Sequence, residues 1–240
     1  MRLVVIAAAI AAIVSLIGTP MLIKFLGRHG YSQAIRVSTE GEQYPDHEAK
    51  RGTPSMGGLA IIAGVVAGYF LTHLLVWRPL SPSGLLILYL MVGLGLVGMA
   101  DDYLKIFKQR STGMRARSKL LGQATAALLF GYFGMQFPDE QGVTPISHAV
   151  SWIRDTPLVL PSALVLAWVW FLVAGATNGV NLTDGLDGLA IGTVGIVVTT
   201  LAVIAYISGH AELSHYLTIP YLRGNGELSI FCTALGGAAL

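Results

Sequence analysis

The chain has 240 residues, of which 54% are hydrophobic and only 12% are charged, and its formal net charge is +2. A soluble globular domain carries about 25% charged residues, so this composition excludes an ordinary soluble domain and indicates a protein of the lipid bilayer. The single cysteine, Cys232, excludes an internal disulfide and a metal site built from cysteines.

Apolar stretches along the chain predict membrane helices. A helix needs roughly 20 apolar residues to cross about 30 Å of hydrocarbon, and six stretches come close to that length. The six complete spans are predicted at about 3–26, 57–77, 84–100, 120–137, 158–178 and 189–208. A seventh stretch, 228–240, is still apolar at Leu240, so we expect an incomplete span and a chain that continues. The prediction is one integral membrane domain, 1–240, folded as an all-α polytopic transmembrane bundle.

The distribution of lysine and arginine predicts how these spans are oriented. When the spans alternate across the membrane, eleven of the fifteen basic residues lie on one side. The positive-inside rule then places the N-terminus outside and the segments 27–56, 101–119 and 178–188 in the cytoplasm. Polar residues in these segments lie directly against the ends of spans, where they are costly unless they are paired, solvated or functional. A functional site is therefore expected on the cytoplasmic side.

The first cytoplasmic segment ends in the sequence KRGTPSMGG, residues 50–58. Its two cations, Lys50 and Arg51, are followed by hydroxyl groups and glycines, a composition that suits an anionic ligand carrying phosphate. An ordinary basic stop that sets the topology explains the same residues equally well.

The second segment opens with Asp101, Asp102 and Lys105 at the end of the third span. Two adjacent carboxylates repel each other, so they need water, a cation or both, and a divalent ion would supply the charge. If the helix continues, Asp101 and Lys105 share a face and Asp102 points about 100° away, so the two acids can address different partners. Taken alone, such a pattern more often marks an exposed helix end with a salt bridge. The following basic residues, Arg117 and Lys119 among them, suit lipid headgroups or a substrate phosphate.

The third segment, 178–188, reads NGVNLTDGLDG. Its glycines let the backbone approach a ligand, and Asp184 and Asp187 are spaced to face one pocket. A reverse turn between helices is also rich in Asn, Asp and Gly. Such a turn needs only a few residues, however, so the repeated asparagines and acids favour a binding loop.

Together and in this order, KRGTPSMGG, GMADDYLK and TNGVNLTDGLDGLA resemble the phospho-N-acetylmuramoyl-pentapeptide-transferase family over essentially the whole chain. Related polyprenyl-phosphate N-acetylhexosamine-1-phosphate transferases share the acidic motifs but usually lack the first segment. The resemblance implies an enzyme of the bacterial cytoplasmic membrane. It would transfer phospho-MurNAc-pentapeptide from UDP-MurNAc-pentapeptide to undecaprenyl phosphate with Mg²⁺, giving lipid I and UMP in peptidoglycan synthesis.

The same resemblance implies roles for individual residues. Asp101 and Asp102 would be the catalytic acids and, with Asp187, the metal ligands, and Lys105 would contact a phosphate. The implied substrate-binding residues are Lys50, Ser55, Asn181, Asp184 and Asp187, and the basic residues Arg117 and Lys119 are further candidates for that role. Ser55 stands where the family often has threonine. The family has a further metal-binding aspartate and a histidine-bearing loop beyond the position of Leu240, so we expect the 240 residues not to complete the site. Direct attack by the lipid phosphate and a two-step route through an aspartyl phosphate both remain open.

Two other classes of protein are compatible with a polytopic chain. In a secondary transporter, glycine-rich breaks and acids within the membrane would line an ion path, but here the acids cluster at the cytoplasmic ends of spans. A structural scaffold gives no reason for three polar motifs on one side. The expected partners are the two substrates and membrane lipids, with no nucleic acid, and the sequence leaves a homodimer open.

Overall fold

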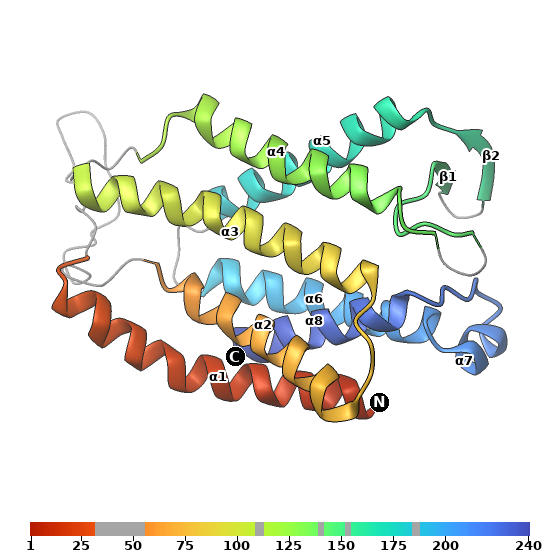
Figure 1. The fold of residues 1–240 in the computed structure, drawn as a ribbon, viewed down its shortest axis with the longest axis horizontal. Coiled ribbons are helices and arrows are strands. Elements are labelled where there is room, and N and C mark those ends of the chain that lie inside the picture. The colour runs from red at the N-terminus through yellow and green to blue at the C-terminus, as the bar shows by residue number, and fades with distance from the viewer. Residues whose placement is uncertain (32–55, 109–112, 139–141, 152–154, 184–187) are drawn as a thin grey trace.

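The computed structural model describes residues 1–31, 56–108, 113–138, 142–151, 155–183 and 188–240. Within these residues the chain is an all-α bundle with one small hairpin, as Figure 1 shows. The helices are α1 (Arg2–Arg28), α2 (Gly58–Val76), α3 (Pro82–Lys108), α4 (Ala116–Gly134), α5 (Ser162–Thr183), α6 (Leu189–Ser208), α7 (Ala211–Tyr216) and α8 (Asn225–Ala239). The strands β1 (Ala149–Ser151) and β2 (Asp155–Val159) pair antiparallel.

Five of the described helices are long and apolar enough to cross a membrane, namely α1, α2, α3, α5 and α6. They confirm the predicted all-α architecture and five of the six complete spans as membrane-length helices. The predicted span 120–137 falls largely in α4, which is not among the five. The helix α4 carries Arg117 and Lys119 in its first turn and Gln123 further along, so it is less apolar than the others. A sixth complete span there, and the orientation of the bundle, stay predictions.

The first six helices, α1 to α6, alternate in direction along the bundle (Figure 1). Between α2 and α3 the chain reverses within a few residues, with Trp77 in the left-handed conformation at φ 53°. Ser81 then starts α3, because its Oγ accepts the backbone N–H of Gly84 at 3.1 Å, and Pro82 occupies the first helical position. In Figure 1 the ends of α1, α3 and α5 therefore lie at the same end of the bundle as the starts of α2 and α4. We call this the site end.

The helices form two packed groups, one of α3, α4 and α5 and the other of α1, α2, α6 and α8. Small residues allow close approach in the second group. A Cβ on Gly68 would lie 2.8 Å from the carbonyl oxygen of Ala7, and one on Gly64 would lie 2.9 Å from that of Ala11. The Ser15 hydroxyl also donates to the carbonyl oxygen of Ala238 at 2.8 Å. Close backbone contacts together with a few interhelical hydrogen bonds are the packing expected in lipid, which removes the hydrophobic driving force between helices.

Candidate active site

The paired acids lie on the last two turns of α3, which continues to Lys108 well beyond the apolar stretch. The Nζ atom of Lys105 lies 2.7 Å from Oδ2 of Asp101 and 3.2 Å from Oδ1 of Asp102. The predicted salt bridge between Asp101 and Lys105 is confirmed. The expectation that the two acids address different partners is incomplete, because one ammonium group contacts both carboxylates. The side chains differ in exposure, at 11% for Asp101 and 27% for Asp102.

Asp101 is also held from the segment that leads into α4. Its Oδ1 accepts the backbone N–H of Met114 at 2.7 Å. This contact depends on Gly113, because a Cβ there would overlap Oδ1 of Asp101 and come within 2.8 Å of Cε of Lys105. A backbone donor thirteen residues away has no signature in the sequence, so neither Gly113 nor Met114 was predicted. Asp101 therefore connects the end of α3 to the segment that leads into α4.

The basic residues at the start of α4 differ in their position. Lys119 is partly buried and close enough to interact electrostatically with the Asp101 carboxylate. Arg117 is exposed at the surface. Lys119 thus lies near the acids, whereas Arg117 lies on the surface, where either a phosphate or a lipid headgroup could reach it.

The end of α5 carries two asparagines of the third motif. The helix runs to Thr183, so Asn178 and Asn181 are helical and the predicted binding loop begins later than its sequence suggested. Nδ2 of Asn178 donates to Oε1 of Gln123 on α4 at 3.2 Å and to the carbonyl oxygen of Ala174 at 2.8 Å. Asn181 is exposed on the last turn. Gln123 was not predicted, although a glutamine inside an apolar stretch was a weak signal.

Four predicted site residues lie outside the described part of the chain: Lys50, Ser55, Asp184 and Asp187. Their flanking residues are described and lie at the site end. Tyr31, at the start of the segment with Lys50 and Ser55, contacts Phe107 of α3 with ring centroids 6.0 Å apart. Thr183 and Gly188 flank the segment that holds the two aspartates. Tyr31 therefore lies beside the last turn of α3.

The donor atoms at the site end suit a magnesium ion. Mg²⁺ prefers oxygen ligands and is often bound by one or two carboxylates together with substrate phosphates and water. Asp101 and Asp102 supply two carboxylates at one place. In the described ranges, no three His, Cys, Asp or Glu residues gather as a complete metal site. The site as described fits an ion that shares its coordination with a phosphate ligand.

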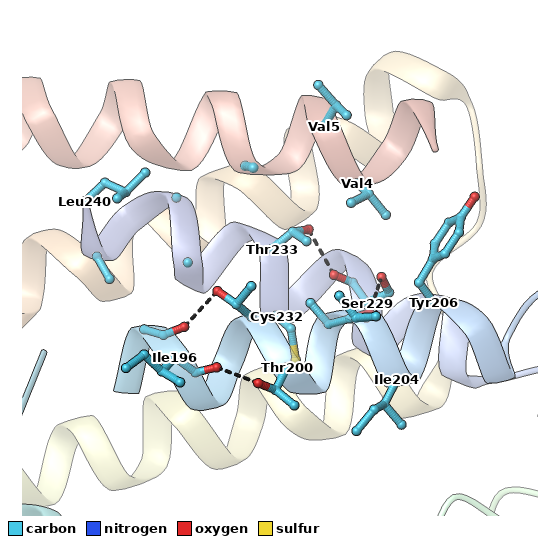
Figure 2. Close-up of a pocket in the computed structure, with 18 of the residues that line it drawn as sticks. Val4, Val5, Ile196, Thr200, Ile204, Tyr206, Ser229, Cys232, Thr233 and Leu240 are labelled. Carbon is cyan, nitrogen blue, oxygen red and sulfur yellow. Dashed lines mark hydrogen bonds between the residues drawn. The ribbon is translucent and has the colours of Figure 1, made fainter. Parts of the chain in front are cut away.

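A large groove lies away from these residues, between α1, α6 and α8 (Figure 2). Its volume is about 1090 Å³, and none of the described residues lining it is charged. The hydroxyl groups of Thr200 and Thr233 donate to carbonyl oxygens of their own helices, those of Ile196 and Ser229, each at 2.9 Å. The groove therefore offers a mainly apolar surface.

Comparison with known proteins gives the family. The pattern of "Glycosyl transferase family 4" matches residues 84–240, and that of "Phospho-N-acetylmuramoyl-pentapeptide-transferase signature 1" matches residues 50–62. The first match includes α3 with its paired acids, and the second includes the KRGTPSMGG segment.

Curated relatives carry the name phospho-N-acetylmuramoyl-pentapeptide-transferase. The protein of Frankia casuarinae is 47% identical over 206 residues, which are 86% of this chain and 57% of the relative. That of Streptomyces coelicolor is 41% identical over 254 residues, covering 100% of this chain and 69% of the relative. That of Cutibacterium acnes is 47% identical over 193 residues, covering 80% and 53%. The chain thus spans between about half and two thirds of the length of these relatives. On these matches, the chain belongs to glycosyl transferase family 4 and, within it, to the bacterial phospho-N-acetylmuramoyl-pentapeptide-transferases.

Proposed function

We propose that the chain takes part in the Mg²⁺-dependent transfer of phospho-MurNAc-pentapeptide from UDP-MurNAc-pentapeptide to undecaprenyl phosphate, giving lipid I and UMP. The observation that carries the proposal is the cluster of Asp101, Asp102 and Lys105 at the end of an apolar helix. A site at this depth can meet a lipid phosphate at the membrane surface and a soluble nucleotide from the aqueous side. The family of the chain supplies the identity of the two substrates.

The reaction brings two anions together, so charge is the main physical obstacle. Mg²⁺, when bound by the acids, would neutralise the diphosphate and support UMP as the leaving group. Lys105 and Lys119 would add positive charge beside the phosphates, since both already interact with the carboxylates. Arg117 and Asn181, exposed on α4 and α5, would contact the nucleotide or the lipid headgroup.

We assign different tasks to the two acids. Both oxygens of Asp101 are engaged, Oδ1 by the N–H of Met114 and Oδ2 by Lys105, so this side chain holds the site together and offers its remaining lone pairs to the metal. Asp102 is the more exposed acid and is better placed to accept a proton or to face a phosphoryl group. By family resemblance, Asp187 completes the metal ligands, and Lys50, Ser55 and Asp184 border the nucleotide.

The proposal includes an orientation in the bacterial cytoplasmic membrane. Most of the described basic residues flank the site end: Lys24, Arg28, Lys105, Lys108, Arg115, Arg117 and Lys119. The positive-inside rule therefore places this end in the cytoplasm and the N-terminus outside. A cysteine introduced at the exposed Arg115, in a Cys232→Ala background, should react with an impermeant maleimide only when the cytoplasmic face is accessible.

The experiment uses the purified chain in liposomes that contain undecaprenyl phosphate. Two quantities are measured, the Mg²⁺-dependent affinity for UDP-MurNAc-pentapeptide and the release of UMP. Binding is the primary readout, since the resemblance implies that further residues complete the catalytic site. We expect nucleotide binding that EDTA abolishes. Binding that is indifferent to Mg²⁺ and to Asp102→Asn would contradict the proposal, and solute uptake into the vesicles without nucleotide binding would point to a transporter.

A further inference from the structure

The contact between α4 and α5 contains a polar pair, in which Gln123 is buried and Asn178 is partly buried. Gln123 is 3% exposed and lies on the face of α4 that meets α5. Its Oε1 accepts a hydrogen bond from Nδ2 of Asn178, which also donates to the carbonyl oxygen of Ala174. A buried amide away from water is costly unless it is hydrogen-bonded, so this pair strongly favours one alignment of the two helices.

The described apolar contacts between α4 and α5 are less directional than this hydrogen bond. Nearer the other end of α4, Gly131 receives apolar side chains, and a Cβ on it would lie 2.9 Å from Cδ2 of Leu166 and 3.6 Å from Val169. Contacts of this kind are non-directional, so they tolerate small sliding movements of one helix along the other. A hydrogen bond tolerates them much less, because it weakens steeply when its distance or angle changes.

The alignment matters because α4 and α5 run in opposite directions, as Figure 1 shows. Lys119 lies one turn before Gln123 on the same face of α4, and Asn181 lies about one turn after Asn178 on α5. Both steps lead toward the site end, each by about 5 Å. The amide pair therefore brings Lys119 and Asn181 to the same depth, and Lys119 in turn interacts with the Asp101 carboxylate.

We propose that the Gln123–Asn178 hydrogen bond is a positioning contact that sets the register of α5 against α4 and so places Asn181 level with Lys119 at the carboxylate site. Gln123 touches neither metal nor substrate in this role. The importance of the register for chemistry rests on the proposed function, whereas the register itself is a property of the bundle. The two can therefore be tested apart.

The geometric test measures a distance that needs no turnover. Spin labels are attached at Ser118, exposed on the first turn of α4, and at Leu182, 83% exposed on the last turn of α5, in a Cys232→Ala background. We expect one narrow distance distribution in the parent chain. Gln123→Leu keeps the side-chain volume roughly constant and removes the acceptor, so the distribution should broaden or shift by at least about 1.5 Å, the rise of one residue.

Two further variants separate positioning from general damage. The exchange Gln123→Asn with Asn178→Gln keeps two amides and their combined length, and should restore the narrow distribution. Thr125→Val is the matched control, because Thr125 is exposed on α4 and its hydroxyl donates only locally, to the carbonyl oxygen of Leu121 at 2.9 Å. This variant should leave the distance unchanged.

The functional arm measures UMP release by the unlabelled proteins. A displacement near 1 Å at a reacting site can cost up to about 100-fold in rate, so Gln123→Leu should lower kcat roughly 10- to 100-fold with KM within about threefold. The exchange variant should recover most of kcat. If the parent chain itself releases no UMP, as expected of a site that further residues complete, Mg²⁺-dependent nucleotide binding decides the proposed function and the distance measurement alone decides the positioning role. Parent-like distances in Gln123→Leu, or equal broadening in Thr125→Val, would overturn the inference.

Discussion

Two polar clusters at opposite ends of the apolar bundle contact the same helix, α3. The carboxylate cluster consists of Asp101, Asp102 and Lys105. The outer cluster consists of Tyr69 and His73 of α2 with Glu227 of α8. Gly84 of α3 packs directly on Tyr69, and Asp101 follows seventeen residues later, about 25 Å further along the helix.

The outer cluster is closed on itself. Tyr69 is fully buried, and its hydroxyl donates to Oε2 of Glu227 at 2.6 Å. A carbonyl oxygen can only accept, so Nδ1 of His73 donates to the backbone oxygen of Tyr69 at 2.9 Å, and Nε2 lies within hydrogen-bond distance of Oε2 of Glu227, at 3.0 Å. A Cβ on Gly84 would overlap the Tyr69 hydroxyl, so the backbone of α3 packs directly against this hydroxyl. This cluster ties α2 to α8.

The carboxylate cluster is open by comparison. Lys105 contacts both acids, Lys119 also interacts with Asp101, the Asp102 side chain is partly exposed, and one contact comes from a loop backbone. Polar groups that satisfy one another between packed helices stabilise the bundle, whereas adjacent carboxylates at the end of a helix repel each other and can also bind a divalent cation. The comparison teaches that the location of a charged cluster, between packed helices or at the end of one helix beside a loop, separates a structural contact from a candidate binding site better than the presence of charge does.

The largest expected effect concerns the closed cluster. Glu227→Ala would leave the Tyr69 hydroxyl and Nε2 of His73 without their carboxylate partner in an apolar interior, so we expect a loss of about 2–4 kcal/mol in the free energy of unfolding. The measurement is denaturant unfolding in mild detergent. Mg²⁺-dependent nucleotide affinity of the folded fraction should stay within about twofold. A large loss of affinity in a fully folded sample would break the division between the clusters.

Asp102→Asn is the reciprocal change at the open cluster. It keeps the shape of the side chain and removes a charge that the proposed metal needs, so Mg²⁺-dependent nucleotide affinity should fall by roughly 10- to 100-fold. The unfolding free energy should change little, because Asp102 is partly exposed. Glu227→Gln serves as the matched control, an acid-to-amide change that should affect stability and leave affinity unaltered. Equal affinity losses in both variants would argue against a local site.

The sequence predicted the helices that hydropathy alone can define. About 20 apolar residues in lipid have one solution, an α-helix, so α1, α2, α3, α5 and α6 were found. Their ends were not. The helices α1, α3 and α5 each continue past the apolar stretch, to Arg28, Lys108 and Thr183. Lysine, arginine and leucine favour the helical conformation both inside and outside the lipid. A helix can therefore continue past the end of the apolar stretch that hydropathy detects.

The candidate site was predictable only where charge meets the end of a span. Asp101, Asp102 and Lys105 carried that signal and lie together. Gly113 and Met114 did not, since a glycine and a backbone N–H acquire their role only when α4 folds back on α3. The roles of Lys50, Ser55, Asp184 and Asp187 depend on segments outside the described residues and stay predictions.

Gly113→Ala tests whether the open cluster depends on the backbone that closes over it. The new Cβ would push Asp101 away from the N–H of Met114, so nucleotide affinity in the presence of Mg²⁺ should fall by about 10-fold. Gly98→Ala is the control, because nothing lies within 4 Å of a Cβ at that position on α3 and alanine favours helix by up to about 1 kcal/mol. Parent-like affinity in Gly113→Ala would mean that Asp101 does not need this contact.

Tyr69→Phe should have the smallest effect and probes whether α3 connects the clusters. The ring keeps its packing against Gly84, and Glu227 keeps His73 as a partner, so the main loss is the hydrogen bond to Glu227, about 0.5–1.5 kcal/mol of unfolding free energy. Because the hydroxyl lies about 25 Å from the acids, nucleotide affinity should not change. If this single oxygen altered Mg²⁺-dependent binding, the bundle would be transmitting strain along α3, and the outer cluster would have to be counted as part of the site that it otherwise only supports.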